Sequence, residues 1–286
     1  MVKVVTDSTC DIPVEIARGL DITVVPLRIQ IGNETYRDGI DINADRVYHE
    51  LIHGRELPKT SAPSPGDFVT VYNDLAAETG EIVSIHLSPG YSGTRDVARL
   101  ASSYVKDKCR VEVVDSNSVS VGLGLIVIAA ARAAREGKNL DQILDIMHQV
   151  VPQTRVFGKV DNFSYLFKGK RFRLSRGLIL LGKISMALGI KLLGELYDGG
   201  KIRSPKLVFG RAMALNRLKR WADDFAGLSE IAIAYSTTLD EAEMLAQRLE
   251  ALIPREHILI TGLGCVTSTY IGPGTLVMAL VGGKEA

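Results

Sequence analysis

The sequence has few cysteines, almost no net charge and no uninterrupted apolar run long enough to cross a membrane. Its three cysteines, at positions 10, 109 and 265, are far apart, and none has a Cys-x-x-Cys partner or a neighbouring histidine. This spacing argues against both a disulfide framework and a zinc site. Three unpaired cysteines are consistent with a reducing cytoplasm.

Charge and hydropathy exclude further classes of partner. The 34 Lys and Arg residues are balanced by 33 Asp and Glu residues, so there is no basic footprint for nucleic acid or for an anionic membrane surface. The first residues, MVKVVTDST, lack the basic and apolar regions of a signal peptide, and later apolar runs are interrupted by charge, glycine or proline. We therefore expect a cytoplasmic protein without nucleic acid partners and without integral membrane association.

A strand, a turn and a helix follow one another three times in the first half of the chain. Residues 2–6, 81–88 and 109–116 are β-branched runs that end in hydroxyl or acidic side chains, and helical sequence follows each run. This alternation predicts a parallel sheet. In open parallel sheets, ligands bind beyond the carboxyl ends of the strands, so we expect the ligand site beside Thr6–Thr9, Ser88–Thr94 and Asp115–Ser120.

The sequence between the first two repeats predicts three more features. Val24–Gly32 is a β-branched run that predicts one strand, and Asn43–His53 has the cap and the apolar spacing of a helix. Residues 57–67, LPKTSAPSPGD, contain three prolines and a glycine, which predicts a rigid loop without regular structure.

The pattern changes near Thr154. Residues 184–202 resemble a β-hairpin with an Asp-Gly-Gly turn, and residues 211–225 resemble an amphipathic helix. We predict an α/β protein of two domains with a cleft between them. Residues 1–154 are expected to form an N-terminal three-layer α/β/α domain with a parallel sheet, which carries the ligand site, and residues 155–286 a C-terminal two-layer α/β domain with a mixed sheet.

Two pairs of hydroxyl residues are candidate ligand contacts. Ser92-Gly93-Thr94 lies where a strand passes into a helix, and Thr60-Ser61 lies in the proline-rich segment. The first group is either an ordinary helix cap or an anion site built from free amides and the helix dipole. The second is either surface loop, with Ser64 or Asp67 capping the next helix, or a rigid presentation of donors.

Other polar motifs carry weaker signals. Asp7-Ser8-Thr9 with Asp11 forms a conceivable metal site, but no carboxylate or histidine cluster lies at ligand spacing, so a capping turn is favoured and no metal is assigned. The five histidines do not cluster. The helix predicted over residues 120–134 is apolar around most of its circumference and is expected to be buried, where it can line a cavity.

The sequence contains none of the common catalytic motifs. GYSGT is not a Gly-x-Ser-x-Gly elbow, and neither a P-loop nor a Gly-x-Gly-x-x-Gly motif is present. We assign no catalytic residues and expect that the protein is not an enzyme.

Six segments, in this order and at these separations, resemble the DegV family over residues 7–274. They are DSTCDIP (7–13), KTSAPSPGDF (59–68), LSPGYSGT (87–94), VVDSNSVSVGLG (113–124), SYLFKGKR (164–171) and IGPG (271–274). The resemblance implies a carrier that binds a long-chain fatty acid, such as palmitate, stearate or oleate, between its domains and needs no cofactor. It also implies a partner, a fatty acid kinase, to which the carrier presents the carboxylate.

Carried onto this sequence, the resemblance places the carboxylate on Thr60 or Ser61 and on Ser92-Gly93, with Thr94 nearby. Tyr270 stands where the family usually has a histidine, and its neutral phenol can still donate a hydrogen bond. Lys170 and Leu192 replace a usual glycine and a common proline.

Three alternatives remain at this point. They are a serine esterase that uses Ser92, a phosphoryl-transfer enzyme related to dihydroxyacetone kinase, and a binder of another carboxylated or phosphorylated molecule.

Overall fold

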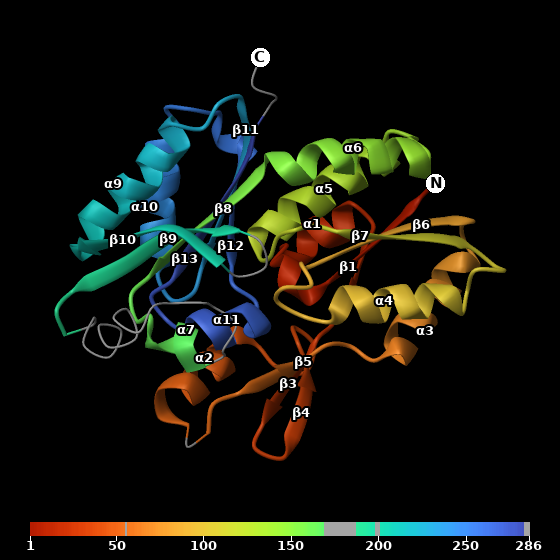
Figure 1. Ribbon diagram of the computed structural model, residues 1–286, viewed down its shortest axis with the longest axis horizontal. Coiled ribbons are helices and arrows are strands. Elements are labelled where there is room, and N and C mark those ends of the chain that lie inside the picture. The colour runs from red at the N-terminus through yellow and green to blue at the C-terminus, as the bar shows by residue number, and fades with distance from the viewer. Residues whose placement is uncertain (55, 169–186, 198–200, 283–286) are drawn as a thin grey trace.

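The computed structural model describes residues 1–54, 56–168, 187–197 and 201–282. Lys170, the first residues of the expected hairpin (184–186) and its turn (198–200) lie outside this part of the chain. Two main sheets lie side by side, with a third, smaller sheet beside them (Figure 1). Within the described residues, no helix is both long enough and apolar enough to cross a bilayer.

The N-terminal sheet is parallel, as the repeated strand-turn-helix pattern predicts. Its four strands follow the order β2 (Ile22–Val25), β1 (Lys3–Asp7), β6 (Glu81–His86) and β7 (Arg110–Asp115). Alternate residues of β1 enter different cores, because successive strand residues point to opposite faces. Val4 belongs to one buried cluster and Val5 to another.

Helices cover both faces of this sheet (Figure 1). The helices α5 (Val121–Arg135) and α6 (Leu140–Gln153) supply the apolar cluster on one face, together with the short α1 (Val14–Gly19). The helices α3 (Pro65–Ala76) and α4 (Thr94–Ser103) cover the other face. The predicted three-layer arrangement is therefore confirmed.

The prediction of one strand over Val24–Gly32 was wrong. The run is divided between β2, which ends at Val25, and β3 (Arg28–Ile31), which belongs to a separate antiparallel sheet with β4 (Glu34–Arg37) and β5 (Lys59–Ser61). Pro26 lies between the two pieces and has no N–H to donate to a ladder, so the chain leaves the first sheet there.

The prediction that residues 57–67 lack regular structure was also wrong, both for a three-residue strand and for residues 65–67, which begin α3. Lys59–Ser61 forms β5, in which Thr60 pairs with Ile29 of β3. Prolines flank this strand at positions 58 and 63 but none lies within it, so its amides remain able to pair. The two caps predicted in this region are present: Asn43 accepts from Arg46 at the start of α2 (Ala44–His53), and Ser64 forms a capping box with Asp67 at the start of α3.

The second main sheet is mixed. Its six strands follow the order β10 (Lys201–Phe209), β9 (Ile190–Tyr197), β8 (Thr154–Val160), β13 (Leu276–Gly282), β11 (Leu228–Tyr235) and β12 (Ile258–Gly262). The pair β11–β12 is parallel, and the other pairs are antiparallel. The prediction of a mixed sheet is confirmed. The predicted domain boundary between residues 154 and 155 lies within one residue of the start of β8 at Thr154, and we keep it as a proposal.

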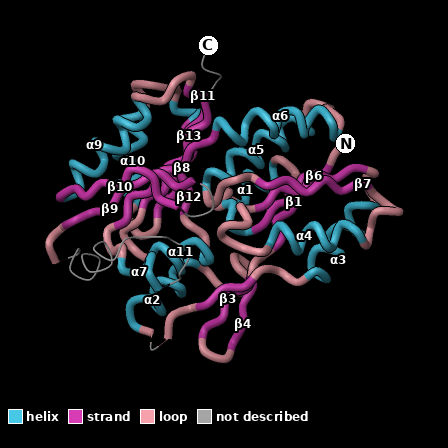
Figure 2. The backbone as a smooth tube through the Cα atoms, viewed as in Figure 1, coloured by secondary structure: helices cyan, strands magenta, loops and turns pink. Residues whose placement is uncertain are grey.

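The two faces of this sheet have different neighbours. The helices α9 (Gly210–Asp223) and α10 (Leu239–Leu249) pack on the outer face. The inner face packs against the start of α5, so the long apolar helix lies between the two domains. Two short helices, α7 (Ser164–Lys168) and α11 (Cys265–Ile271), lie near α2 at the base of the second domain, as the backbone trace also shows (Figure 2).

Two glycines allow α5 to approach both domains closely. A Cβ atom on Gly124 would lie 2.6 Å from the carbonyl oxygen of Cys10 in the 3-10 turn η1 (Ser8–Cys10). A Cβ atom on Gly122 would lie 2.3 Å from a methyl carbon of Val156 in β8. Contacts this short do not occur between real atoms, so any larger residue at either position must displace its neighbour.

We predict that Gly124→Ala lowers the free energy of unfolding by about 1–3 kcal/mol, because the added methyl overpacks the contact with Cys10. This loss should exceed the gain of ~1 kcal/mol that alanine normally provides within a helix. Urea unfolding measures the change. Gly66→Ala in α3 is the control, since its Cβ would meet its nearest neighbour at an ordinary 3.7 Å. An unchanged or higher stability of Gly124→Ala would contradict this packing.

Candidate ligand-binding site

An apolar cavity lies between the domains, beyond the carboxyl ends of β1 and β6. Its empty space, counted together with its open mouth, is about 600 Å³. The lining comes from both domains and consists of Thr9, Leu27, Thr60, Leu87, Tyr91, Ser92, Val119, Ser120, Leu196, Val266, Thr267, Tyr270, Ile271 and Val277. This is the sheet edge at which the strand-turn-helix pattern predicts a ligand site.

Thr60 and Tyr270 bring hydroxyl groups from distant parts of the chain to one point of the lining. Thr60 Oγ1 in β5 and Tyr270 Oη in α11 are 2.5 Å apart, and either can be the donor. A third hydroxyl, that of Ser92, precedes α4 and lines the same cavity. The structure therefore gathers three of the six residues proposed from the sequence around one space.

The remaining three proposed residues are placed differently. Thr94 is buried at the first position of α4, where its Oγ1 lies 2.9 Å from Ser92 Oγ and its amide donates to that same oxygen. Gly93 is exposed and precedes the first turn of α4, where amides lack helical partners. Ser61 is exposed, because neighbouring strand residues point to opposite faces, and it does not line the cavity.

None of the described residues that line the cavity is Lys, Arg or His. Neutral hydroxyls are therefore the side-chain donors among these residues. Ser92 Oγ accepts from the Thr94 amide, so its own hydrogen can point to Thr94 Oγ1 or into the cavity. No group of three or more His, Cys, Asp or Glu side chains with metal-binding geometry occurs in the described ranges.

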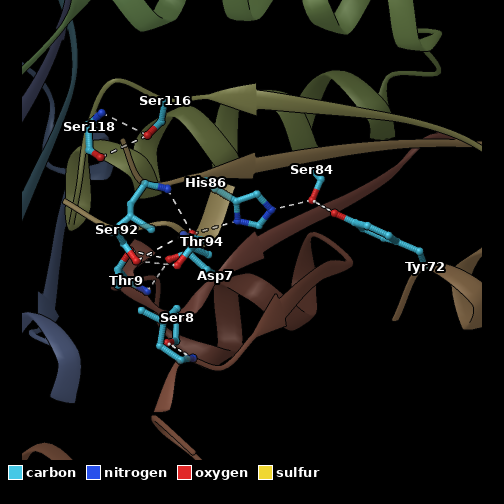
Figure 3. Close-up of polar contacts among 12 residues, drawn as sticks. Asp7, Ser8, Thr9, Tyr72, Ser84, His86, Ser92, Thr94, Ser116 and Ser118 are labelled. Atoms are coloured by element: carbon cyan, nitrogen blue, oxygen red, sulfur yellow. Dashed lines mark hydrogen bonds and ion pairs between the residues drawn. The ribbon is translucent and has the colours of Figure 1, made fainter. Parts of the chain in front are cut away.

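A buried polar chain fixes two of the lining residues (Figure 3). One oxygen of Asp7 accepts from the amide and the hydroxyl of Thr9, and the other accepts from the Leu87 amide and His86 Nδ1. Because Asp7 ends β1 and Leu87 follows β6, one carboxylate ties two strand ends together. Asp7 accepts from Thr9 and thereby caps the turn η1, as the sequence predicts.

The series of buried hydrogen bonds continues from His86 away from the cavity. Ser84 Oγ lies 2.7 Å from His86 Nε2 and 2.8 Å from the hydroxyl of Tyr72, and these side chains are fully buried (Figure 3). Buried polar groups are costly unless their hydrogen bonds are satisfied. These hydrogen bonds give the Asp7 carboxylate partners from the ends of both strands. Of the residues that line the cavity, Thr9 and Leu87 take part in them.

Asp11 joins the two domains. It is 6% exposed, and it accepts from Ser120 Oγ at 2.5 Å in its own domain and from the Gly264 amide at 2.9 Å in the other. Thr267 adds a longer hydrogen bond of 3.4 Å. Gly264 and Thr267 belong to the start of α11, the helix that also carries Tyr270. This contact positions one wall of the cavity.

Further bonds hold the same helix. Asp38 accepts from the Cys265 amide at 3.2 Å, and the hydroxyl of Tyr48 lies 2.6 Å from Ser268 Oγ. Burial raises the pKa of Asp38, and it raises the pKa of Asp11 to about 7 even though the hydrogen bonds from Ser120 and Gly264 act to lower it. The side of α11 that faces the N-terminal domain is thus held by two buried carboxyl groups and a tyrosine.

Sequence reasoning did not identify Asp11 and Asp38 as interdomain contacts. Their partners lie more than two hundred residues away, at Gly264 and Cys265. Asp11 is also distinguished by its backbone conformation, which the structure shows and the sequence does not. Its φ of +49° is unusual for a residue other than glycine, and aspartate is among the residues that tolerate it, at turns and functional positions.

The fold and the cavity define a two-domain α/β protein with an apolar space between its domains. A profile of the family described as "Uncharacterised protein, DegV family" matches residues 1–282. A DegV domain-containing protein of Caldanaerobacter subterraneus is 31% identical over 277 residues, which cover 95% of each chain. The chain belongs to the DegV family.

Two solved structures of relatives share the whole fold. A DegV family protein from Thermus thermophilus, described as binding fatty acid, has a TM-score of 0.84 and 28% identity and covers 99% of each chain. DegV from Bacillus subtilis, described as a fatty acid binding protein, has a TM-score of 0.80 and 27% identity and also covers 99% of each chain.

Asp11 should make stability depend on pH. Because its folded pKa of about 7 lies above the ordinary 3.8, the folded protein keeps a proton between these values that the unfolded chain loses. The free energy of unfolding should therefore fall as pH rises from about 4 to about 7, by on the order of 4 kcal/mol, and then level off. Urea unfolding over this range measures the slope.

The control for this prediction is Asp11→Asn, which keeps the shape of the side chain but does not titrate. Its stability should fall less than that of the wild type, because the share due to Asp11 is lost while Asp38, whose pKa burial also raises, still titrates. The difference between the two proteins should therefore grow as pH rises. Parallel pH profiles for the wild type and Asp11→Asn would contradict the assignment of this titration to Asp11.

Proposed function

We propose that the protein binds a long-chain fatty acid in the interdomain cavity, with the carboxylate on Thr60, Ser92 and Tyr270. The observation that carries this proposal is an apolar cavity in which neutral hydroxyls from both domains converge. An acyl chain matches the apolar walls, and a carboxylate matches the donors. The descriptions of the T. thermophilus and B. subtilis relatives as fatty-acid-binding support this choice of ligand.

The tail supplies most of the affinity under this proposal. Burying about a dozen methylene groups at ~0.8 kcal/mol each contributes on the order of 10 kcal/mol before the entropy cost of binding. The lining is suited to this burial, since Leu27, Leu87, Val119, Leu196 and Val277 are apolar and come from both domains. The hydroxyl end then fixes the orientation of the acid, and its hydrogen bonds offset the cost of removing the carboxylate from water.

The head group needs no buried cation. A carboxylate that accepts hydrogen bonds from neutral donors gains about 1.5–3 kcal/mol from each, which offsets the cost of removing it from water. The hydroxyls of Thr60 and Tyr270 are hydrogen-bonded to each other. A carboxylate oxygen placed between them replaces this mutual bond, and Ser92 turns its hydrogen from Thr94 toward the second oxygen.

The head-group end is also the end closer to solvent. Thr60 and Ser92 are half-buried and Gly93 is exposed, whereas Ile271 and Val277 at the tail end are buried. A partner enzyme could reach the carboxylate from this side while the tail stays covered. We therefore propose, with the family resemblance as support, that the protein presents its acid to a fatty acid kinase in the cytoplasm for formation of an acyl phosphate.

Mass spectrometry of lipid released by denaturation tests the ligand. Protein purified from a bacterial host should release long-chain fatty acids, and delipidated protein should take up palmitate or oleate at about one molecule per chain. If neither release nor uptake occurs, the proposed ligand class is wrong. Identification of a different carboxylated or phosphorylated molecule would replace it.

Ser92→Ala should weaken palmitate binding about 10- to 100-fold, because it removes one hydrogen bond to a charged group. Tyr270→Phe, which removes only the hydroxyl, should have an effect of similar size. Ser102→Ala is the control, since Ser102 Oγ bonds the Arg99 carbonyl on α4 away from the cavity. Displacement of a fluorescent fatty acid measures all three variants.

Equal effects of Ser92→Ala and Ser102→Ala would remove Ser92 from the site. Turnover of p-nitrophenyl esters by the wild type, abolished by Ser92→Ala, would identify an esterase instead. In the structure His86, the buried histidine of this region, contacts Asp7 and Ser84 rather than Ser92.

A further inference from the structure

Two glycines lie directly opposite each other in the middle of the C-terminal sheet. Gly158 in β8 pairs with Gly194 in β9, between the apolar pairs Val156–Leu196 and Val160–Leu192. Both glycines face the inner side of the sheet, because their neighbours Val156, Val160 and Leu192 belong to the inner apolar cluster. The row of large apolar side chains on this face is thus interrupted by two residues that have no side chain.

The interruption lies under a second apolar cavity, whose empty space together with its open mouth is about 370 Å³. Its lining consists of Gly158, Val160, Leu166, Leu192, Gly194, Leu196, Ile202, Ile271, Thr275 and Val277. Leu196, Ile271 and Val277 also line the first cavity. The two spaces therefore adjoin, and together they lead from the hydroxyls of Thr60 and Tyr270 to the glycine pair.

The backbone does not require glycine at position 158. Its φ is not among the positive values, so any L-residue fits its conformation, and a Cβ atom built there meets no atom within 4 Å. Glycine weakens a strand interior, and there it commonly marks a place that another group approaches closely. The free space above Gly158 is the cavity itself.

Gly194 has a different role. A Cβ atom there would lie 2.3 Å from a methyl carbon of Ile202, so this glycine lets the Ile202 side chain lie across β9. Val277 lies on the other side of Gly158, since it pairs with Gly158 from β13. These residues form a trough in the sheet surface, with Gly158 as its open floor and with Ile202 and Val277 as its sides.

We propose that the distal part of the acyl chain lies over Gly158. The absence of a side chain at this position sets the length of the longest fatty acid that the protein accepts. This inference rests on the proposed function, because it concerns the far end of the same ligand. A side chain at position 158 would occupy the space of the last methylene groups and leave the head-group contacts unchanged.

Binding of stearate, palmitate and laurate to the wild type, Gly158→Leu and Gly158→Ala tests the inference. Each methylene kept from burial lowers affinity about fourfold, so Gly158→Leu, which displaces two or three of them, should bind stearate about 15- to 60-fold more weakly. Its laurate affinity should change less than about threefold, because the shorter chain ends before the trough. Gly158→Ala should show the same selective loss for stearate, about fourfold.

Gly262→Leu is the matched control. Gly262 is an exposed residue of β12 in the same sheet, a Cβ atom there also meets no neighbour, and it lines neither cavity. This variant should keep the wild-type order of affinities. Thermal unfolding shows whether Gly158→Leu folds, and if it does not, Gly158→Ala decides the question.

An unchanged ratio of stearate to laurate affinity in folded Gly158 variants would overturn this inference while leaving the proposed function intact. A wild type that binds none of the three acids would overturn both. The two failures are distinguished by the wild-type measurement.

Discussion

The buried carboxyl group of Asp11 is the contact on which the site depends. It accepts hydrogen bonds from Ser120 in the N-terminal domain and from Gly264 at the start of α11. The same short helix carries Tyr270, whose hydroxyl meets Thr60 of the small sheet. The cavity exists because α11 is held in this position, so the proposed head-group site belongs to the pair of domains and to neither alone.

The chemistry of the cavity separates affinity from orientation. Its walls are apolar, and the hydroxyl groups that converge on it are uncharged. Apolar burial is non-directional and grows with the length of the tail, whereas hydrogen bonds to a carboxylate are directional and few. Titratable groups of the same region, Asp7, Asp11 and Asp38, accept hydrogen bonds that tie strands and domains together. The titratable residues that hold the structure together are thus different from the hydroxyl residues that we propose contact the ligand.

Local pattern predicted much of the fold and part of the site. Three strand-turn-helix repeats predicted the parallel sheet, because hydrophobic period and turn chemistry are local properties. Thr60, Ser92 and Tyr270 were named from motifs and family resemblance, and the structure brings them together. The division of Val24–Gly32 into two strands was missed because either side of Pro26 looks alike in sequence. The role of Asp11 was missed because its partner lies at position 264, and contacts between distant segments leave no local pattern.

The central claim is that one fatty acid lies across both domains with its carboxylate among the hydroxyls. A crystal structure of the palmitate complex tests this most directly. The account predicts carboxylate oxygens within hydrogen-bonding distance of Thr60, Ser92 and Tyr270, and a tail that passes Ile271 and Val277 toward Gly158. A carboxylate bound to a lysine or arginine elsewhere would contradict it. So would a fatty acid in the reverse orientation, with its methyl end beside Thr60.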